Sequence, residues 1–202
     1  MKVLVACEFS GIVRDAFIAK GHDAWSCDLL PTESRVERHI TGDVRAVLDG
    51  KWDLMIAHPP CTYLTCAGNK WFGPKHKTRF PHREEQRKEA TAFFLYLANS
   101  GVPKMCIENP VGVMSTRYRK PDQIIQPYQF GHDARKTTCL WLHGLPKLKP
   151  TKIVVPTIVR TAGGNTMSQW HVDCGHYNRK ERSRLRSITF QGIANAMAEQ
   201  WG

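Results

Sequence analysis

Short apolar runs alternate with amphipathic stretches along the first half of the chain. Four apolar runs predict buried strands, at residues 2–7, 24–27, 54–56 and 105–107. Apolar positions repeat at helical spacing in the stretches between them, at residues 12–20 and 83–99. Strands that alternate with helices form a mostly parallel sheet with helices on its faces. The pattern therefore predicts an α/β fold, which a strand in the tail of residues 135–142 and a closing helix at 191–201 complete.

The first strand, helix and second strand together predict a nucleotide-type βαβ unit. The first strand leads into the turn Phe9-Ser10-Gly11, and the second strand ends on Asp28. In such a unit the helix N-terminus faces a ligand and the acid accepts hydrogen bonds from ribose hydroxyls. Because Gly11 is the one glycine of the turn, the spacing leaves binding of a nucleoside cofactor and an ordinary βα turn equally open.

The central strand is followed by two prolines and a cysteine, Pro59-Pro60-Cys61. Proline cannot extend the hydrogen-bond ladder, so the chain must leave the sheet at the carboxyl end of this strand, where open α/β sheets place their chemistry. A thiol on such a turn suits a nucleophile, although a cysteine can also be a small buried apolar residue. Glu108 ends the next strand, so we expect a thiol and a carboxyl in one cleft.

Three stretches lack a regular pattern and predict loops: residues 31–41, 62–82 and 143–187. Basic and aromatic residues mix in 62–82, and Lys70, Trp71, Lys75 and Arg79 suit a mobile element that grips phosphates and unstacked bases. The alternative is a solvated loop that packs down on its aromatic residues. Asp43, which follows the first loop, either meets a ligand at the sheet edge or caps the short stretch after it.

Composition narrows the class of protein. The 202 residues form one domain, residues 1–202, and carry a formal charge of +11, which favours a polyanion such as nucleic acid as partner over a merely solvated surface. No apolar run is long enough to span a membrane, and seven cysteines without regular spacing favour reduced thiols in the cytoplasm. A monomer is the default expectation.

Taken together, the motifs resemble those of the cytosine-5 DNA methyltransferases, in the same order along nearly the whole chain. The resemblance implies a Rossmann-like fold that binds S-adenosylmethionine through Phe9, Ser10, Gly11, Asp28, Leu29, Asp43 and Pro59. It implies Cys61 as nucleophile, Glu108 and Arg135 as further catalytic residues, and Asn109, Lys136 and the basic loop as contacts to DNA. No metal is implied.

The chain departs from the family pattern at several positions. Val13 and Arg14 stand where the cofactor turn usually has glycines, His58 replaces the usual glycine before the two prolines, and Pro110 and Ile193 replace a valine and an asparagine. The short basic insert at 143–187 stands in place of a target-recognition domain, as in compact forms from phages and prophages, which would work in the bacterial host cytoplasm.

The resemblance implies methyl transfer to carbon 5 of cytosine in DNA through a covalent adduct on Cys61. That chemistry requires a lowered pKa of the thiol and a partly protonated or strongly hydrogen-bonded Glu108. Three alternatives remain: the same reaction on a cytosine nucleotide or on RNA, a degenerate enzyme that only binds DNA, and a metal-stabilised binding protein built on His171, Cys174 and His176.

Overall fold

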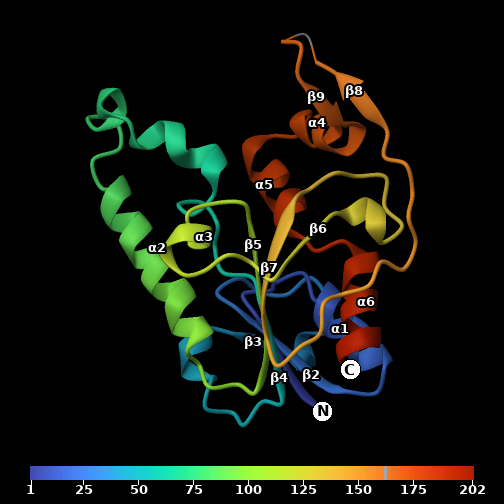
Figure 1. Cartoon of the computed structure of the whole chain (residues 1–202). Helices are drawn as coiled ribbons and strands as arrows, with labels where there is room; N and C mark the ends of the chain where they lie inside the picture. The colour runs from blue at the N-terminus through green and yellow to red at the C-terminus, as the bar shows by residue number, and fades with distance from the viewer. Residues whose placement is uncertain (162) are drawn as a thin grey trace.

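The computed structural model describes residues 1–161 and 163–202. Its centre is a seven-stranded sheet with the order β3-β2-β1-β4-β5-β7-β6 (Figure 1). The strands are β1 (Lys2–Ala6), β2 (Asp23–Asp28), β3 (His39–Thr41), β4 (Leu54–Ala57), β5 (Lys104–Pro110), β6 (Gln123–Ile125) and β7 (Thr138–His143). Strands β1 to β5 pair in parallel, and β7 runs antiparallel to both of its neighbours. The predicted α/β fold with a mostly parallel sheet is confirmed, and it is compatible with a Rossmann-like arrangement.

Helices cover both faces of the sheet (Figure 1). Helices α1 (Ile12–Ala19) and α6 (Gln191–Trp201) pack on one face, and α2 (Arg83–Ala98) with the short α3 (Met114–Arg117) packs on the other. Alternate side chains of β1 enter the two layers, Val3 and Val5 toward α1 and α6, and Leu4 and Ala6 toward α2. This division follows from the two-residue period of a strand that is buried on both faces.

The structure corrects the prediction of a loop at residues 31–41. A 3-10 helix, η1 (Val36–Arg38), leads there into the edge strand β3, and a second one, η2 (Val44–Ala46), follows it. Strand β3 has three residues and pairs with β2 alone. A strand that short has too few positions to show a two-residue alternation.

The stretch 62–82 forms two 3-10 helices, η3 (Cys66–Phe72) and η4 (Pro74–His76), beside helix α2. The insert at 143–187 was predicted to be irregular, and this is wrong. It contains the antiparallel pair β8 (Ile158–Arg160) and β9 (Thr166–Ser168), followed by the helices α4 (Gln169–Gly175) and α5 (Arg179–Ser187). Between β6 and β7 lies one further 3-10 helix, η5 (Pro127–Gln129).

Candidate active site

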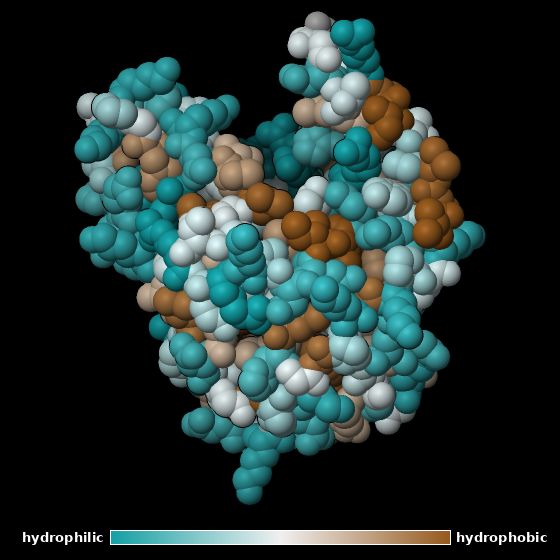
Figure 2. Space-filling view, viewed as in Figure 1, coloured by the Kyte–Doolittle hydropathy of each residue, from teal (hydrophilic) through white to brown (hydrophobic). Residues whose placement is uncertain are grey.

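A cavity of about 760 Å³ opens at the carboxyl edge of the sheet. The turns after β1 and β4 and the ends of β2 and β5 form its floor, and α4 and α5 form one wall. Strand order reverses between β1 and β4, so the connections that leave these two strands diverge and leave a crevice, which is the usual ligand site of open α/β sheets. The space-filling view shows a hollow, with hydrophilic residues at its bottom, between the α2 side and the β8–β9 side (Figure 2).

The turn after β4 places the Cys61 thiol in this cavity. The Cys61 carbonyl accepts hydrogen bonds from the amides of Leu64 and Thr65 at 2.9 and 3.0 Å, which closes the turn behind the two prolines. Asn109 is 1% exposed, and its Nδ2 donates to the Pro59 carbonyl at 2.8 Å. The side chain expected to contact substrate thus fixes the turn that carries the predicted nucleophile.

Gly112 lets the Cys61 turn lie directly against the end of β5. A Cβ atom at Gly112 would come within 2.0 Å of the Leu64 carbonyl oxygen. Two backbone hydrogen bonds join the segments at this point, from Val113 N to the Leu64 oxygen at 2.9 Å and from Cys66 N to the Val111 oxygen at 3.0 Å. Residues of two separate motifs are therefore held in one rigid arrangement.

Glu108 and His58 form a largely buried pair in the same cavity. In the parallel register of β4 and β5, Ala57 lies beside Ile107, so the residues that follow them are neighbours. His58 Nδ1 lies 3.2 Å from Glu108 Oε2, and the two side chains are 9% and 18% exposed. His58 stands at a position noted only as a departure from the family pattern, and its contact with Glu108 is not readable from the sequence.

The protonation states differ from those the sequence predicts. Burial raises the pKa of the Cys61 thiol, as does the nearby Glu108 carboxylate, while Lys136, a backbone hydrogen bond and Arg186 lower it. Burial also acts to raise the pKa of Glu108, but the hydrogen bond from His58 and the charges of Lys136 and His58 bring it below its ordinary value. The expectation of a lowered thiol pKa is therefore wrong for this structure, whereas of the two alternatives for Glu108 it is the hydrogen-bonded one that is present.

The turn after β1 is organised by Glu8, which was not among the predicted site residues. Its carboxylate accepts hydrogen bonds from Val13 N at 2.7 Å and Arg14 N at 3.3 Å, which satisfies free amides at the N-terminus of α1. Ser10 Oγ donates to the same carboxylate at 3.3 Å. Burial raises the pKa of Glu8, and His58 and the two amides lower it. An acid shortly before a predicted helix was the available signal.

The predicted cofactor residues divide into two groups. Phe9, Ser10, Asp28 and Pro59 line the cavity. Asp28 Oδ1 accepts from Leu30 N at 2.8 Å, and it is Leu30 rather than its neighbour Leu29 that faces the cavity. Gly11 lies outside the lining but is required by the turn, because its φ is +76° and a Cβ there would meet Arg14 Nη2 at 2.3 Å.

Asp43 takes the capping role that was the alternative for it. Its carboxylate accepts from Arg45 N at 2.9 Å at the start of η2 and forms an ion pair with the Arg45 guanidinium. The same hydrogen bonds lower its pKa. It does not line the cavity.

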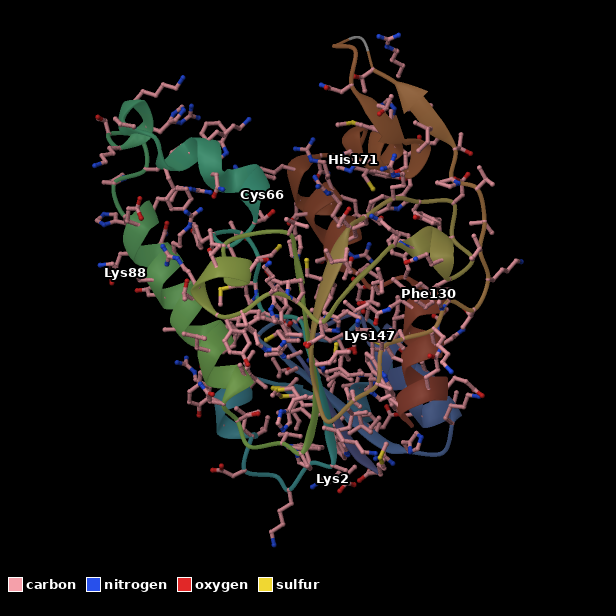
Figure 3. The ribbon with its side chains drawn as sticks, viewed as in Figure 1. Lys2, Cys66, Lys88, Phe130, Lys147 and His171 are labelled. Carbon is pink, nitrogen blue, oxygen red and sulfur yellow. The ribbon has the colours of Figure 1, made fainter. Side chains whose placement is uncertain are left out.

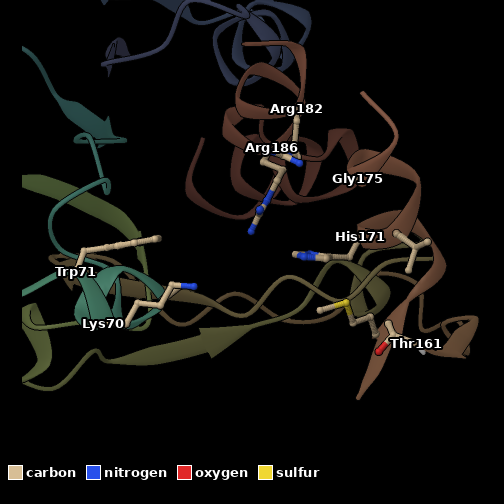
Figure 4. Close-up of a pocket in the computed structure, with 10 residues that line it drawn as sticks. Lys70, Trp71, Thr161, His171, Gly175, Arg182 and Arg186 are labelled. Atoms are coloured by element: carbon tan, nitrogen blue, oxygen red, sulfur yellow. The ribbon is translucent and has the colours of Figure 1, made fainter. Parts of the chain in front are cut away.

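A second, smaller cavity of about 670 Å³ adjoins the first and is strongly basic. Ala67, His171, Arg182 and Arg186 line both cavities, and Lys70 and Trp71 line the second one. Lys70, His171 and Arg186 point into the space between η3 and the α4–α5 pair (Figure 4). No carboxylate is among its described lining residues.

Residues from α4 and α5 were not among the predicted catalytic, cofactor or DNA contacts, and His171 and Cys174 of α4 were named only for the alternative metal site. Arg179, Arg182 and Arg186 all line the larger cavity from one face of α5, and their spacing of three and four residues was the signal that could have found them. Figure 3 shows Cys66, next to Ala67, across from His171 on α4.

The remaining predicted residues are placed as follows. Arg135 and Lys136 line the larger cavity just before β7, and Asn109 lines it from β5. Lys75 and Arg79 are exposed and line neither cavity. The stretch 62–82 is fastened to α2, because Arg87 donates to the Tyr63 carbonyl at 2.8 Å and stacks on Phe72 at 3.3 Å from the ring centroid. Packing on aromatic residues, the alternative for this stretch, is present.

Comparisons with known proteins do not assign the chain to a family. No protein-family model matches the chain, and no curated protein matches it significantly. Among residues 1–161 and 163–202 there is no group of three or more His, Cys, Asp or Glu side chains that could hold a metal ion, so His171, Cys174 and His176 form no such group. None of the helices that the structure describes is both long and apolar enough to cross a bilayer.

Proposed function

We propose that this chain is an S-adenosylmethionine-dependent methyltransferase that modifies carbon 5 of cytosine in DNA. The observation that carries the proposal is the joining of two motifs into one site, in which the Cys61 thiol and the Glu108 carboxyl line a single cavity at the switch point of the sheet. Asn109 locks the two motifs together through the Pro59 carbonyl. A nucleophile and a proton-carrying group on one rigid frame suit addition to an electron-poor ring.

The residues on the β1–β2 side of the cavity fit the nucleoside part of the cofactor. Phe9 offers an aromatic face, Leu30 an exposed apolar side chain, and Asp28 a carboxylate at the end of β2. Asp28 Oδ2 makes no hydrogen bond to the part of the chain that the structure describes, so it can accept from a ribose hydroxyl. S-adenosylmethionine supplies an electrophilic methyl group when bound. Val13 and Arg14, the altered positions of the turn, line neither cavity and leave this space open.

Cys61 and Glu108 divide the chemistry between them. Carbon 5 of cytosine is a weak nucleophile, and attack of the Cys61 thiolate on carbon 6 converts the ring to an enamine that can accept a methyl group. Glu108 would hold ring nitrogen 3 and withdraw charge as the adduct forms. Loss of the carbon 5 proton and departure of Cys61 restore the aromatic ring.

The second cavity favours a polymer over a free nucleotide. Lys70, Arg182 and Arg186 surround a space whose described lining holds no acidic residue and which shares residues with the cavity that Cys61 lines. Such cations suit phosphates of a chain that continues beyond the target base. Trp71 can stack on an unpaired base there. A base in duplex DNA must leave the stack, which costs about a few kcal/mol, and these contacts can offset that cost.

The test is transfer of a labelled methyl group to cytosine-containing duplex DNA, with Cys61→Ala measured alongside. We expect label in 5-methylcytosine with the intact thiol and loss of turnover in Cys61→Ala, which should still bind the cofactor. Phe9→Ala and Asp28→Ala should weaken cofactor binding in calorimetry. Turnover that is unchanged in Cys61→Ala would reject the covalent mechanism, and label on RNA or a cytosine nucleotide but not on DNA would reassign the substrate.

A further inference from the structure

Three ionisable side chains lie in a row at the carboxyl edge of three adjacent strands. Glu8 follows β1, His58 follows β4, and Glu108 belongs to β5, and these strands are neighbours in the order β1-β4-β5. The registers bring them together, because Ala6 lies beside Ala57 and Ala57 lies beside Ile107. All three side chains line the larger cavity. Glu8 and Glu108 have been accounted for above, and His58 has not.

His58 is a largely buried side chain that contacts Glu108 through one ring nitrogen and leaves the other nitrogen without a partner in the described chain. Its imidazole is 9% exposed and pairs through Nδ1 with Glu108. Its Nε2 is buried and makes no hydrogen bond within the described chain. The carboxyl of Glu8 lies on the other side, close enough for His58 to influence its charge. In the strand order His58 therefore stands between two carboxyl groups, and one of them, Glu108, lies within hydrogen-bond distance of its ring.

We propose that His58 is a proton-carrying residue that supplies, through Glu108, the proton required at cytosine nitrogen 3. The proposal rests on the function proposed above. It adds a role for a residue at which this chain departs from the family that it resembles. His58 touches Glu108 and not the base, so it acts as a positioning and proton-supplying residue behind the catalytic carboxyl.

Addition of Cys61 to the cytosine ring moves three electron pairs and one proton. The thiolate electron pair of Cys61 forms the sulfur–carbon 6 bond, the carbon 5–carbon 6 π pair moves to carbon 4–carbon 5, and the carbon 4–nitrogen 3 π pair moves onto nitrogen 3. The Nδ1 proton of the His58 imidazolium passes to the Glu108 carboxylate, and Glu108 passes it on to nitrogen 3, which leaves His58 neutral and Glu108 again a carboxylate. When Cys61 departs, the proton returns by the same route.

The same proton transfer helps to activate the nucleophile. The Glu108 carboxylate is one of the two influences that raise the pKa of the Cys61 thiol. While the proton passes through Glu108 that repulsion is weakened, which favours the thiolate as it attacks carbon 6. Other ionisable groups near the pair also affect how its charge depends on pH. They are Glu8 on the β1 side, Cys61 after β4, Lys136 before β7, and the thiols of Cys106 and Cys139.

The first test compares His58→Asn with the wild type in methyl transfer. Asparagine places an amide N–H near the position of Nδ1, so it keeps a hydrogen bond to Glu108 but has no proton to give. We expect kcat to fall about 10²-fold at neutral pH, as for loss of a general acid, with KM for S-adenosylmethionine unchanged. Because Glu108 alone must then carry the proton, the alkaline limb of the kcat profile should move to lower pH.

A double variant separates this role from simple packing. If His58 acts through Glu108, His58→Asn combined with Glu108→Gln should be no slower than Glu108→Gln alone. Additive losses, or a His58→Asn profile with wild-type shape, would overturn the proposal.

A second measurement does not depend on turnover. The Glu108 carboxyl is followed by carbon-13 NMR in the substrate-free protein, with Glu108→Gln to assign its signal. His58→Ala removes both the hydrogen bond and the charge that lower the pKa of Glu108, so this pKa should rise. An unchanged titration means that the pair does not exist in solution and overturns the proposal. If the pKa of Glu108 rises in His58→Ala but the wild-type protein transfers no methyl group, the pair is confirmed, and both the proton relay and the proposed methyl transfer are rejected.

Discussion

Replacement of Arg14 by methionine should destabilise the whole β1–α1–β2 unit. The Arg14 side chain is fully buried, although arginine is permanently charged. Its guanidinium donates to Asp15 Oδ1 at 2.9 Å, to Ser26 Oγ at 2.8 Å and to the Ser34 carbonyl at 2.5 Å, with a weaker contact to Thr32. The residue therefore ties α1 both to β2 and to the loop that follows β2.

The expected loss in free energy of unfolding follows from these hydrogen-bond partners. Methionine keeps most of the length and apolar volume of arginine but donates no hydrogen bond. Each of the three shorter hydrogen bonds contributes about 1 kcal/mol net. The larger cost of a buried group without any partner does not apply, because Ser26 keeps a bond to His39 and the Ser34 carbonyl keeps one from Thr32. We therefore expect Arg14→Met to lower the free energy of unfolding by about 3 kcal/mol. At roughly 2–4 °C per kcal/mol for a chain of this size, Tm should fall by roughly 6–12 °C.

The assay is urea denaturation followed by tryptophan fluorescence, with Arg35→Met as the matched control. Arg35 lies 3.5 Å from the same Asp15 carboxylate but is 53% exposed, so its loss should cost less than about 1 kcal/mol. If Arg14→Met stays within about 1 kcal/mol of the wild type, or if the two variants are equally stable, the structural role assigned to Arg14 is refuted.

Three further predictions concern the site. Gly112→Ala should lower kcat about 10²-fold, measured in single-turnover assays, because its Cβ would push the Cys61 turn off β5. Arg182→Gln and Arg186→Gln should each weaken DNA binding and should each make the slope of log K against log salt concentration shallower by about one. Fluorescence anisotropy between low and moderate salt measures both effects. Since burial raises the pKa of Cys61, alkylation by iodoacetamide should be slow at neutral pH and should still accelerate above pH 9, and Lys136→Gln should move this rise further upward.

The sequence predicts the helices and strands in which apolar residues repeat at the spacing of the buried face. Phe94 and Leu97 on the predicted apolar face of α2 are fully buried, and the predicted closing helix is α6 with the same limits. Periodicity does not encode the direction of a strand, so it could not show that β7 runs antiparallel to β5. It also fails in short elements, which is why β3, β8 and β9, each of three residues, fell within predicted loops.

The candidate site was predictable as far as strand order places residues at one edge of the sheet, and unpredictable where a contact depends on the register between strands. Cys61 and Glu108 could be assigned to one edge because consecutive parallel strands present their carboxyl ends together. The contact of His58 with Glu108 depends on the register of β4 against β5, and that of Glu8 with His58 depends on the position of β1 beside β4. Register is set by packing along whole strands, so no local pattern near His58 could reveal either neighbour.

The insert supplies the basic wall and is also fastened to the cofactor side of the cavity. Arg184 on α5 binds the Glu33 carboxylate through two nitrogens, at 2.5 and 2.7 Å, while Glu33 N donates to the Phe9 carbonyl at 3.0 Å. Arg182 and Arg186 lie one turn or less from Arg184 on the same helix and face the proposed DNA site. A displacement of α5 by bound phosphates would therefore act directly on the turn that carries Phe9. Under the proposed function, this linkage is a physical route by which binding of nucleic acid would influence binding of the methyl donor.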